Sequence, residues 1–439
     1  MMFSLRISCG NETIWLHGPS AQPPVKGSRR QPIPRALEGG RCEEQIDLLL
    51  EGTPLSIQWT LQSIERLLSR ARAGQSAGLH LMATASDSEW EARLLDGRAE
   101  LLGAGTPERG RGSQAVRLLL VRGDCWQGSL TALPLSNPAG SNVTDGLPLF
   151  NHCGADAAHA NYADAGGGMG SLPAPALVEL IHDVSAPEAL TDIWLGLGLS
   201  PLPGGVLEAE SAASSLTTQT VADPACSDGS FRRVSWTGAA EVDVLHWELT
   251  QDWLGQAGGR CFRPLLRFAT LFAFSDLSLS VQIRTAGSVL FESPAQTLQA
   301  GVCLQELHPV LLPPWVPLTG PPAALTLALV GRRTGGGSST LDLDFVGLLP
   351  LQGWRRYVSL SGLPYGARLV DDPSTGRCVT LHAQNGELVG YAAQGPGLEV
   401  QPGQGQRFAV LFATGSPAGM DIAAQVRLKV SYRPRKRTV

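Results

Sequence analysis

Hydrophobic and polar residues alternate along much of the chain, which is the pattern of β-strands that bury one face. Residues 3–9 alternate strictly, Gly10-Asn11 would form a turn, and residues 12–16 would return as the second strand of a hairpin. The same alternation recurs at 277–283, 325–329, 341–345 and 424–432, and further strands are predicted at 78–83 and 115–122. The chain is therefore predicted to be mainly β.

One segment, residues 54–73, has the periodicity of an amphipathic helix. Thr53 is suited to the N-cap and Pro54 to the first helical position, and Gly74 could end the helix. An apolar stripe recurs every three or four residues, at Ile57, Leu61, Ile64 and Leu68. Such a stripe needs an apolar surface to cover, so we expect the helix to lie on a sheet. Further along, strands at 89–95 and 98–102 are predicted around a turn at Asp96-Gly97.

The pattern divides the chain into four segments. Residues 1–135 form a β domain that contains the helix, and residues 136–172 form a linker or arm rich in Asn, Gly and Ala. Residues 173–354 read as a jelly-roll β-sandwich, because many short strands are separated by Gly and Pro turns. Residues 355–439 form a small C-terminal β domain.

Composition supports a β-rich protein and narrows its chemistry. The 51 Gly and 31 Pro disfavour a helical bundle, and a hydrophobic content of 43% disfavours a disordered chain. Net charge is uneven, at +1 over 1–135, −12 over 136–354 and +6 over 355–439. Nucleic-acid binding by the acidic middle is therefore not expected, and we expect no specific nucleic-acid binding by the chain. Only three of the 34 basic residues are lysines; a GC-rich genome or fixed arginine pairs between subunits would each explain this.

From the cysteine spacing and the hydropathy we expect no zinc ribbon, no signal peptide and no membrane-spanning segment. The eight cysteines are scattered without a CxxC pair, which is typical of reduced, buried thiols. The first residues lack the pattern of a signal peptide, and no apolar stretch is long enough to span a bilayer.

No catalytic or phosphate-binding motif is present, so we expect neither an enzyme nor a cofactor. A cluster of His152, Asp156, His159 and Asn161 could be a metal site, supply a catalytic base, or be a polar linker, and its spacing favours the linker. Asp342 and Asp344 are two apart on a predicted strand and so share one face. They could act as paired carboxylates, bind calcium, or form the solvated face of the strand. The pair Glu208 and Glu210 has the same alternatives.

Aromatic residues suggest a surface for sugars. Several of the ten Trp residues lie in the jelly-roll segment, where they could fill the core or stack on sugar rings. Trp315, in the loop Pro313-Pro314-Trp315, is the best candidate for an exposed one. The candidate glycan-contact residues are therefore Trp315, Asp342 and Asp344.

Several segments carry a resemblance to a known family. They include the run 48–53 leading into the helix, the turn sequence 94–98, the segment 133–137 and the residues Asn151-His152. Others are the segment 172–175, which contains Pro173, the segments 207–210 and 341–345, which each contain an acidic pair, and the segment 430–435. Together they resemble the tail proteins of tailed bacteriophages and prophages, and are similar to siphophage distal tail proteins.

The resemblance implies a fold, an assembly and a location. Residues 1–135 would adopt a tail-tube-like β fold, and the central sandwich would be carbohydrate-binding-like. The chain would form a homo-oligomer, in such proteins a hexameric ring between tube and tip. Its partners would be itself, other phage tail proteins and host surface glycans. It would be assembled in the cytoplasm of the host bacterium and end in the tail of the virion. Two other functions stay open, a free carbohydrate-binding protein and a glycoside hydrolase using Glu208, Glu210, Asp342 and Asp344.

Overall fold

In the computed structural model the chain forms two compact units. The terminal unit contains Met1–Thr131, Met169–Ala174 and Arg433–Val439, and the sandwich unit contains Ala132–Gly168 and Pro175–Tyr432. The residues that the structure describes are 3–18, 25–31, 33–83, 88–102, 112–142, 145–150, 160–182, 189–198, 206–249, 254–255, 257–271, 273–285, 288–314, 324–351, 353–381, 388–390, 392–414 and 425–437.

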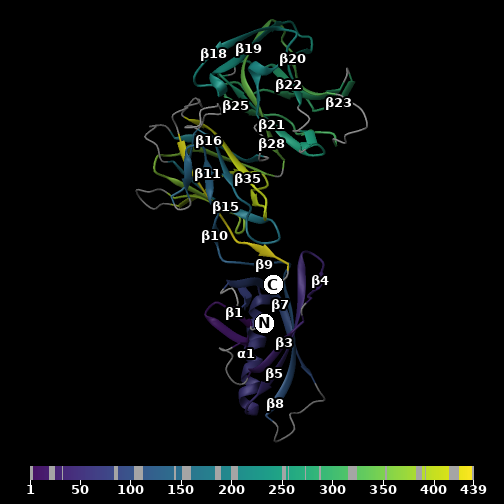
Figure 1. The fold of residues 1–439 in the computed structure, drawn as a ribbon, viewed down its shortest axis with the longest axis vertical. Coiled ribbons are helices and arrows are strands. Elements are labelled where there is room, and N and C mark those ends of the chain that lie inside the picture. Colours follow the sequence, from purple (N-terminus) through teal and green to yellow (C-terminus); the bar gives the residue numbers. More distant parts are fainter. Residues whose placement is uncertain are drawn as a thin grey trace. The chain divides into compact units, whose positions relative to one another are not determined.

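The terminal unit is built on one antiparallel sheet, confirming the predicted β character of this part (Figure 1). The two ends of its strand path, β2 and β3, approach each other, so the sheet is strongly curved. Its strands in spatial order are β2 (Glu12–His17), β1 (Phe3–Cys9), β6 (Ala77–Ala83), β7 (Ser88–Leu102), β8 (Ser113–Gly123), β5 (Arg41–Glu51) and β3 (Val25–Arg30). Three short strands join it, β4 (Arg35–Leu37), β9 (Trp126–Gln127) and β37 (Arg435–Lys436).

The predicted helix is present as α1 (Pro54–Arg72) and packs mainly on β7. Its apolar stripe enters the core of the terminal unit, where Ile64, Leu67 and Leu68 are fully or almost fully buried beside the inward side chains of the sheet. The Thr53 hydroxyl accepts a hydrogen bond from the amide of Ser56 at 3.1 Å, as an N-cap should. The helix is thus held by its apolar face and by its first turn.

Removing the N-cap should weaken this unit by a measurable amount. The change Thr53→Ala leaves the Ser56 amide without its acceptor, and we expect it to lower the free energy of unfolding of the terminal unit by about 1 kcal/mol. Thr53→Ser keeps the hydroxyl and should cost much less. Hydrogen exchange of the first-turn amides of α1 would measure both, and equal protection in the two variants would contradict the capping role.

The turn predicted at Asp96-Gly97 is wrong, because β7 runs through it as one continuous strand. Its register against β8 shifts between Leu94 and Asp96, which marks a β-bulge. Asp96 accepts hydrogen bonds from the Gly97 amide at 2.7 Å and from Arg72 of the helix at 2.8 Å. A Cβ at Gly97 would lie 2.9 Å from the Leu68 side chain and 3.0 Å from the Leu119 carbonyl. The glycine therefore serves close packing of helix on sheet rather than chain reversal.

The sandwich unit contains two β-sandwiches, and the first is assembled from distant parts of the sequence. The strands β10 (Thr131–Ala132), β11 (Leu135–Asn137), β12 (Gly140–Asn142), β13 (Leu147–Phe150) and β14 (Tyr162–Ala165) lie early in the chain. One sheet has the path β36 (Gln425–Tyr432), β15 (Ala174–His182), β30 (Arg368–Asp372), β31 (Arg377–Leu381) and β32 (Leu388–Gly390), with β13 and β34 (Glu399–Val400) beside it. The other runs β12, β11, β14, β35 (Gln406–Thr414), β16 (Leu190–Gly198), β29 (Trp354–Leu363) and β33 (Ala392–Gln394).

Side chains from the second of these sheets reach the first, so the two form the faces of one sandwich. Arg355 and Tyr357 on β29 both donate hydrogen bonds to Asp371 on β30, at distances of 2.7 to 3.1 Å. Asp371 is 2% exposed, and its charge is thus matched inside the sandwich.

The second sandwich is inserted between β16 and β29, two neighbouring strands of the first. One of its sheets follows β18 (Thr217–Ala222), β19 (Ser230–Thr237), β28 (Ser338–Pro350), β21 (Cys261–Phe268) and β25 (Leu304–Glu306), joined by β17 (Val206–Glu208) and β26 (Val310–Leu311). The other follows β20 (Val242–Leu249), β27 (Leu325–Arg333), β22 (Leu277–Thr285) and β23 (Ser288–Glu292), joined by β24 (Gln296–Thr297). Short 3-10 turns occur at η2 (Ala209–Ser211) and η3 (Ser227–Gly229). One apolar core lies between the two sheets.

This connectivity differs from the division predicted at 136, 173 and 355. The segment 355–439, predicted as a separate C-terminal domain, supplies β29–β36 to both sheets of the first sandwich. The segment 136–172, predicted as a linker or arm, supplies β11–β14 to the same sandwich. The predicted jelly roll at 173–354 contains one complete sandwich, from β17 to β28, and two strands of the other. Long-range strand pairing therefore overrides the linear order of segments.

Candidate functional site

Three of the four acidic residues singled out from the sequence meet in the second sandwich. Glu208 at the end of β17, Glu210 in η2 and Asp344 on β28 surround the loop 223–229, which joins β18 to β19. We call Glu208, Glu210, Asp344 and this loop the carboxyl cluster. The short strand β17 pairs with β28 next to Asp344, with Glu208 opposite Phe345, and this pairing brings the two acidic pairs together.

Asp344 is the fixed centre of the carboxyl cluster. It is fully buried, forms an ion pair with Arg267 at 2.9 Å, and accepts a hydrogen bond from the Ser227 amide at 2.9 Å. Arg267 is also buried and donates a hydrogen bond to the Ala225 carbonyl at 2.6 Å. The arginine and the aspartate thus hold the middle of the loop, at Ala225 and Ser227, against the sheet.

Glu208 adds a third contact to the loop. Its Oε1 accepts a hydrogen bond from the Ser227 hydroxyl at 2.7 Å, and its carbonyl accepts one from the Trp247 indole at 2.7 Å. The Oε2 atoms of Glu208 and Glu210 are buried and have no donor among the residues that the structure describes. Two carboxyl groups with buried, unmatched oxygens favour the protonated, neutral form.

Burial governs the protonation of these groups. Burial, helped by the nearby Asp344 and Glu210 carboxyls and opposed by the Ser227 hydroxyl, raises the pKa of Glu208 to about 8. Burial also raises the pKa of Asp344 to about 7, against the opposing effect of the Arg267 guanidinium. The pKa of Glu210 is raised as well, again chiefly by burial. The cluster therefore holds at least one proton near neutral pH.

Asp342 lies apart from this cluster, although it shares the face of β28 predicted from the i, i+2 spacing. It accepts two parallel hydrogen bonds from Arg233 on β19, both at 2.7 Å, and a third from Thr270 at 3.2 Å. Its side chain is 8% exposed. The face that carries Asp342 and Asp344 is therefore covered by arginines from the two flanking strands and is not solvated.

The glycan-contact prediction meets a physical obstacle at two of its three residues. Asp342 is enclosed by Arg233, and Asp344 has no surface from which to reach a sugar. The same burial argues against a hydrolytic pair, because both carboxyl groups of a glycosidase must flank the bond that is cleaved. Trp315, together with His152, Asp156 and His159 of the His cluster, lies outside the described residues. Asn161 is described, and its side-chain amide donates to the Val410 carbonyl at 3.4 Å.

The structure also reveals residues that the sequence did not single out. Arg267, Ser227 and the loop between β18 and β19 complete the cluster, and no local motif marks them. Within the described part of the chain, no group of three or more His, Cys, Asp or Glu side chains could hold a metal ion. No helix there is long and apolar enough to cross a membrane. The arrangement is suited to holding a proton and fixing a loop.

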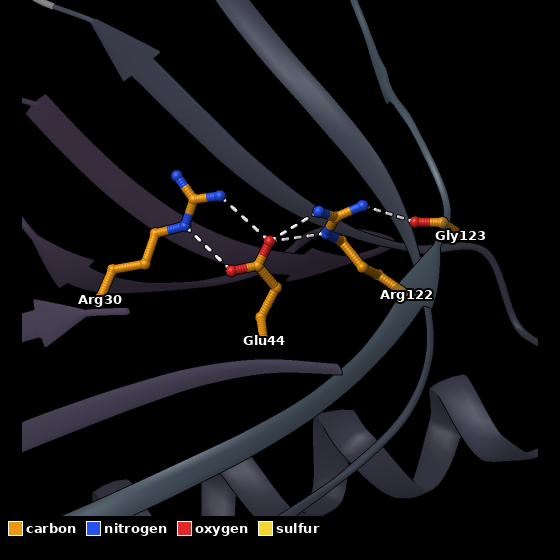
Figure 2. Close-up of polar contacts among 4 residues, drawn as sticks. All are labelled: Arg30, Glu44, Arg122 and Gly123. Atoms are coloured by element: carbon orange, nitrogen blue, oxygen red, sulfur yellow. Dashed lines mark hydrogen bonds and ion pairs between the residues drawn. The ribbon is translucent and has the colours of Figure 1, made fainter. Parts of the chain in front are cut away.

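A second buried charge cluster lies in the terminal unit (Figure 2). Glu44 on β5 accepts hydrogen bonds from Arg30 on β3, both at 3.0 Å, and from Arg122 on β8, at 2.7 and 2.9 Å. Arg122 also donates to the Gly123 carbonyl at 2.6 Å. Both guanidinium groups lie over the ring of buried Trp126, at 5.1 and 4.9 Å from its centre. Three strands are thereby tied at one point.

Arginine–carboxylate pairs of this kind recur throughout both units. Two-pronged pairs within the described chain include Arg117–Asp47, Arg233–Asp342, Arg355–Asp371, Arg356–Asp192 and Arg407–Asp164. Each joins two strands of one unit. The excess of arginine over lysine thus has a structural use inside the chain itself, since a planar guanidinium matches a carboxylate at two points.

Stability of the sandwich unit should fall as the pH rises. Folding raises the pKa of Glu208 from 4.5 to about 8. The stability that the protonated carboxyl contributes is therefore fully present below its unfolded-state pKa and is lost as the pH rises through about 8. We expect the free energy of unfolding to decrease by on the order of 2 kcal/mol between about pH 5 and about pH 9. Chemical unfolding curves over this range would measure the change.

Glu208→Gln separates this effect from other titrations. A neutral amide cannot be deprotonated, so the variant should be more stable than wild type at high pH and should show a flatter pH profile. Glu248→Gln on β20 removes an exposed carboxylate of the same sandwich and is the matched control. An unchanged slope in Glu208→Gln would contradict the proton assigned to this residue.

Comparison with known proteins gives only distant structural likenesses. The sequence matches no protein-family model and no curated protein sequence. A chain of the phage P2 baseplate in its activated conformation with Ca aligns over 100% of both chains, with 8% identity and a TM-score of 0.27. The exo-β-1,3-galactanase of Phanerochaete chrysosporium, bound to β-1,3-galactotriose, aligns over 70% of this chain and 78% of its own, with 10% identity and a TM-score of 0.22.

Proposed function

We propose that the protein is a structural component of a bacteriophage tail, related to distal tail proteins, which forms a homo-oligomeric ring of six copies between tube and tip. The observation that supports this is the agreement between the sequence resemblance and the architecture. A curved sheet carrying one amphipathic helix occupies the terminal unit, and β-sandwiches make up the rest. The role is one of assembly and not of catalysis.

The pairing of buried charged side chains within the fold supports a structural role. Charged groups that could serve a reaction are instead paired within the fold, as with Asp344 and Arg267, or Glu44 and its two arginines. Assembly would take place in the bacterial host, and the finished protein would belong to the virion. Contact with host glycans, if the second sandwich provides it, would have to use a surface other than the enclosed Asp342 and Asp344.

The oligomer tests the proposal directly. Light scattering after gel filtration and electron microscopy of the purified full chain should detect rings of six copies, alone or with a tail-tube protein. A chain that stays monomeric at high concentration and does not join tail particles would overturn it. A glycan array probed with the full chain addresses the adsorption role separately.

A further inference from the structure

The second sandwich has one edge strand without the usual protection against pairing. β18 forms the outer edge of its sheet and pairs only with β19 among the described strands, from Thr217 opposite Ser235 to Ala222 opposite Ser230. Its sequence, Thr-Thr-Gln-Thr-Val-Ala, is uncharged and contains neither proline nor glycine. Its three threonines and its valine favour strands, and a charge or a proline is the common means of blocking an edge.

Other edges of the sandwich unit are shorter or closed. β12, β25, β32 and β33 have three residues each. β20 is covered where His246 and Ala213 exchange two backbone hydrogen bonds of 2.9 Å. β23 ends in Glu292 and its pairing to β22 contains a register shift, which disturbs the line of free backbone groups. Among the described strands of the sandwich unit, the six residues of β18 are therefore the longest regular edge of this kind.

β18 has exposed side chains on both of its faces, and the loop that follows its last residue is held in place. Four of its side chains are exposed, namely Thr217, Gln219, Thr220 and Ala222. The loop that follows is held by Asp344, Glu208 and Arg267 through the contacts of the carboxyl cluster. A free edge on a rigid hairpin loses little conformational freedom when a partner strand pairs with it.

We propose that β18 is an interaction surface for a second copy of this chain, which adds its own β18 in antiparallel orientation about a two-fold axis. The partner strand must be compatible in charge along the whole edge, and β18 itself meets this condition because no like charges would face each other. Asp223, the first charge beyond the strand, would lie opposite the uncharged Ser215–Thr217 region of the other copy. Backbone hydrogen bonds across the axis would join the two sheets into one.

This contact goes beyond the proposed ring. A two-fold contact uses the same patch on both copies and joins only two, so it cannot by itself close a ring of six. It is an additional contact between copies, and the two proposals can fail independently.

Lysines on the edge test the pairing. In the double variant Thr217→Lys/Gln219→Lys, two exposed positions of each copy gain a charge that its symmetry mate repeats, and the dimer should weaken by about tenfold or more. Thr237→Lys places the same charge at an exposed position of β19, whose two edges are both occupied, and is the matched control. Sedimentation velocity of the full chain over a range of concentrations measures the association, and thermal unfolding confirms that each variant is folded.

Hydrogen exchange gives a second measurement that needs no variant. The outward amides of residues 217–222 should become protected as wild-type concentration increases, and those of β19 should not change. Exchange that is independent of concentration, a chain without self-association, or association that the double lysine variant leaves intact would each overturn the β18 contact. Rings that persist in the double variant would leave the proposed tail function standing.

Discussion

Replacing Glu44 by alanine is expected to lower the free energy of unfolding of the terminal unit by about 3–5 kcal/mol. The carboxylate is fully buried and is the shared acceptor of Arg30 and Arg122, whose side chains are 9% and 0% exposed. Without it two guanidinium groups remain close together in a site shielded from water, and Trp126 can offset only part of that cost. The strands β3, β5 and β8 lose their common tie.

The measurement should follow the terminal unit alone, because a chain with two units need not unfold in one step. Hydrogen exchange of the β5 and β8 amides under mild denaturant reports the local free energy. Arg122→Met keeps the Arg30–Glu44 pair and should cost clearly less than Glu44→Ala. Glu100→Ala removes one partner of the exposed pair Arg98–Glu100 and should cost less than about 1 kcal/mol. Equal losses in Glu44→Ala and Glu100→Ala would refute the role of burial.

Local patterns were sufficient where a single segment determines its own structure. The strand at 3–9, the turn at Gly10 and the helix from Pro54 depend on side-chain period and on caps, and all appear in the structure. The bulge at Asp96-Gly97 shows the limit of such patterns. An Asp-Gly pair is typical of a turn, but here Arg72 and Leu68 of the helix act on it, and both are more than twenty residues away.

Domain boundaries depend on pairings that no local pattern encodes. β16 lies between β29 and β35, whose residues follow it by more than 150 positions. An inserted sandwich separates these strands in the sequence and leaves no signal at its ends beyond turn residues. A linear division into domains therefore predicts a separate module for the last 85 residues, whereas β29–β36 complete the first sandwich and β37 joins the terminal unit.

The candidate site was predictable in part. The spacing of Asp342 and Asp344 predicts that they share one face of the strand, and the sequence leaves the same alternatives open for Glu208 and Glu210. Which residues would meet depended on β17 pairing with β28, and the neutralising Arg267 comes from a third strand. Acidic pairs in a sequence thus indicate a cluster only after the strand order is known.

Truncating Trp354 should both destabilise the sandwich unit and uncouple its two sandwiches. Trp354 on β29 and Trp194 on β16 stack with ring centres 5.4 Å apart, and both are almost fully buried. They share one apolar cluster with Leu265 and Phe345 of the inserted sandwich. We expect Trp354→Ala to cost about 3–5 kcal/mol, because a large cavity replaces the ring at this junction.

Arg263 and Glu306 lie at the same junction, and we do not expect them to compensate for the loss of the Trp354 ring. Arg263 of β21 lies over the Trp354 ring at 5.0 Å and pairs with Glu306 at 2.5 Å, so it would lose its aromatic surface. In calorimetry of the full chain we expect separate transitions for the two sandwiches in Trp354→Ala and one transition for the whole unit in wild type. Trp59→Ala, which removes a helix side chain that is 64% exposed, is the matched control and should change stability by less than about 0.5 kcal/mol. A single unshifted transition in Trp354→Ala would mean that the stacked tryptophans do not couple the sandwiches.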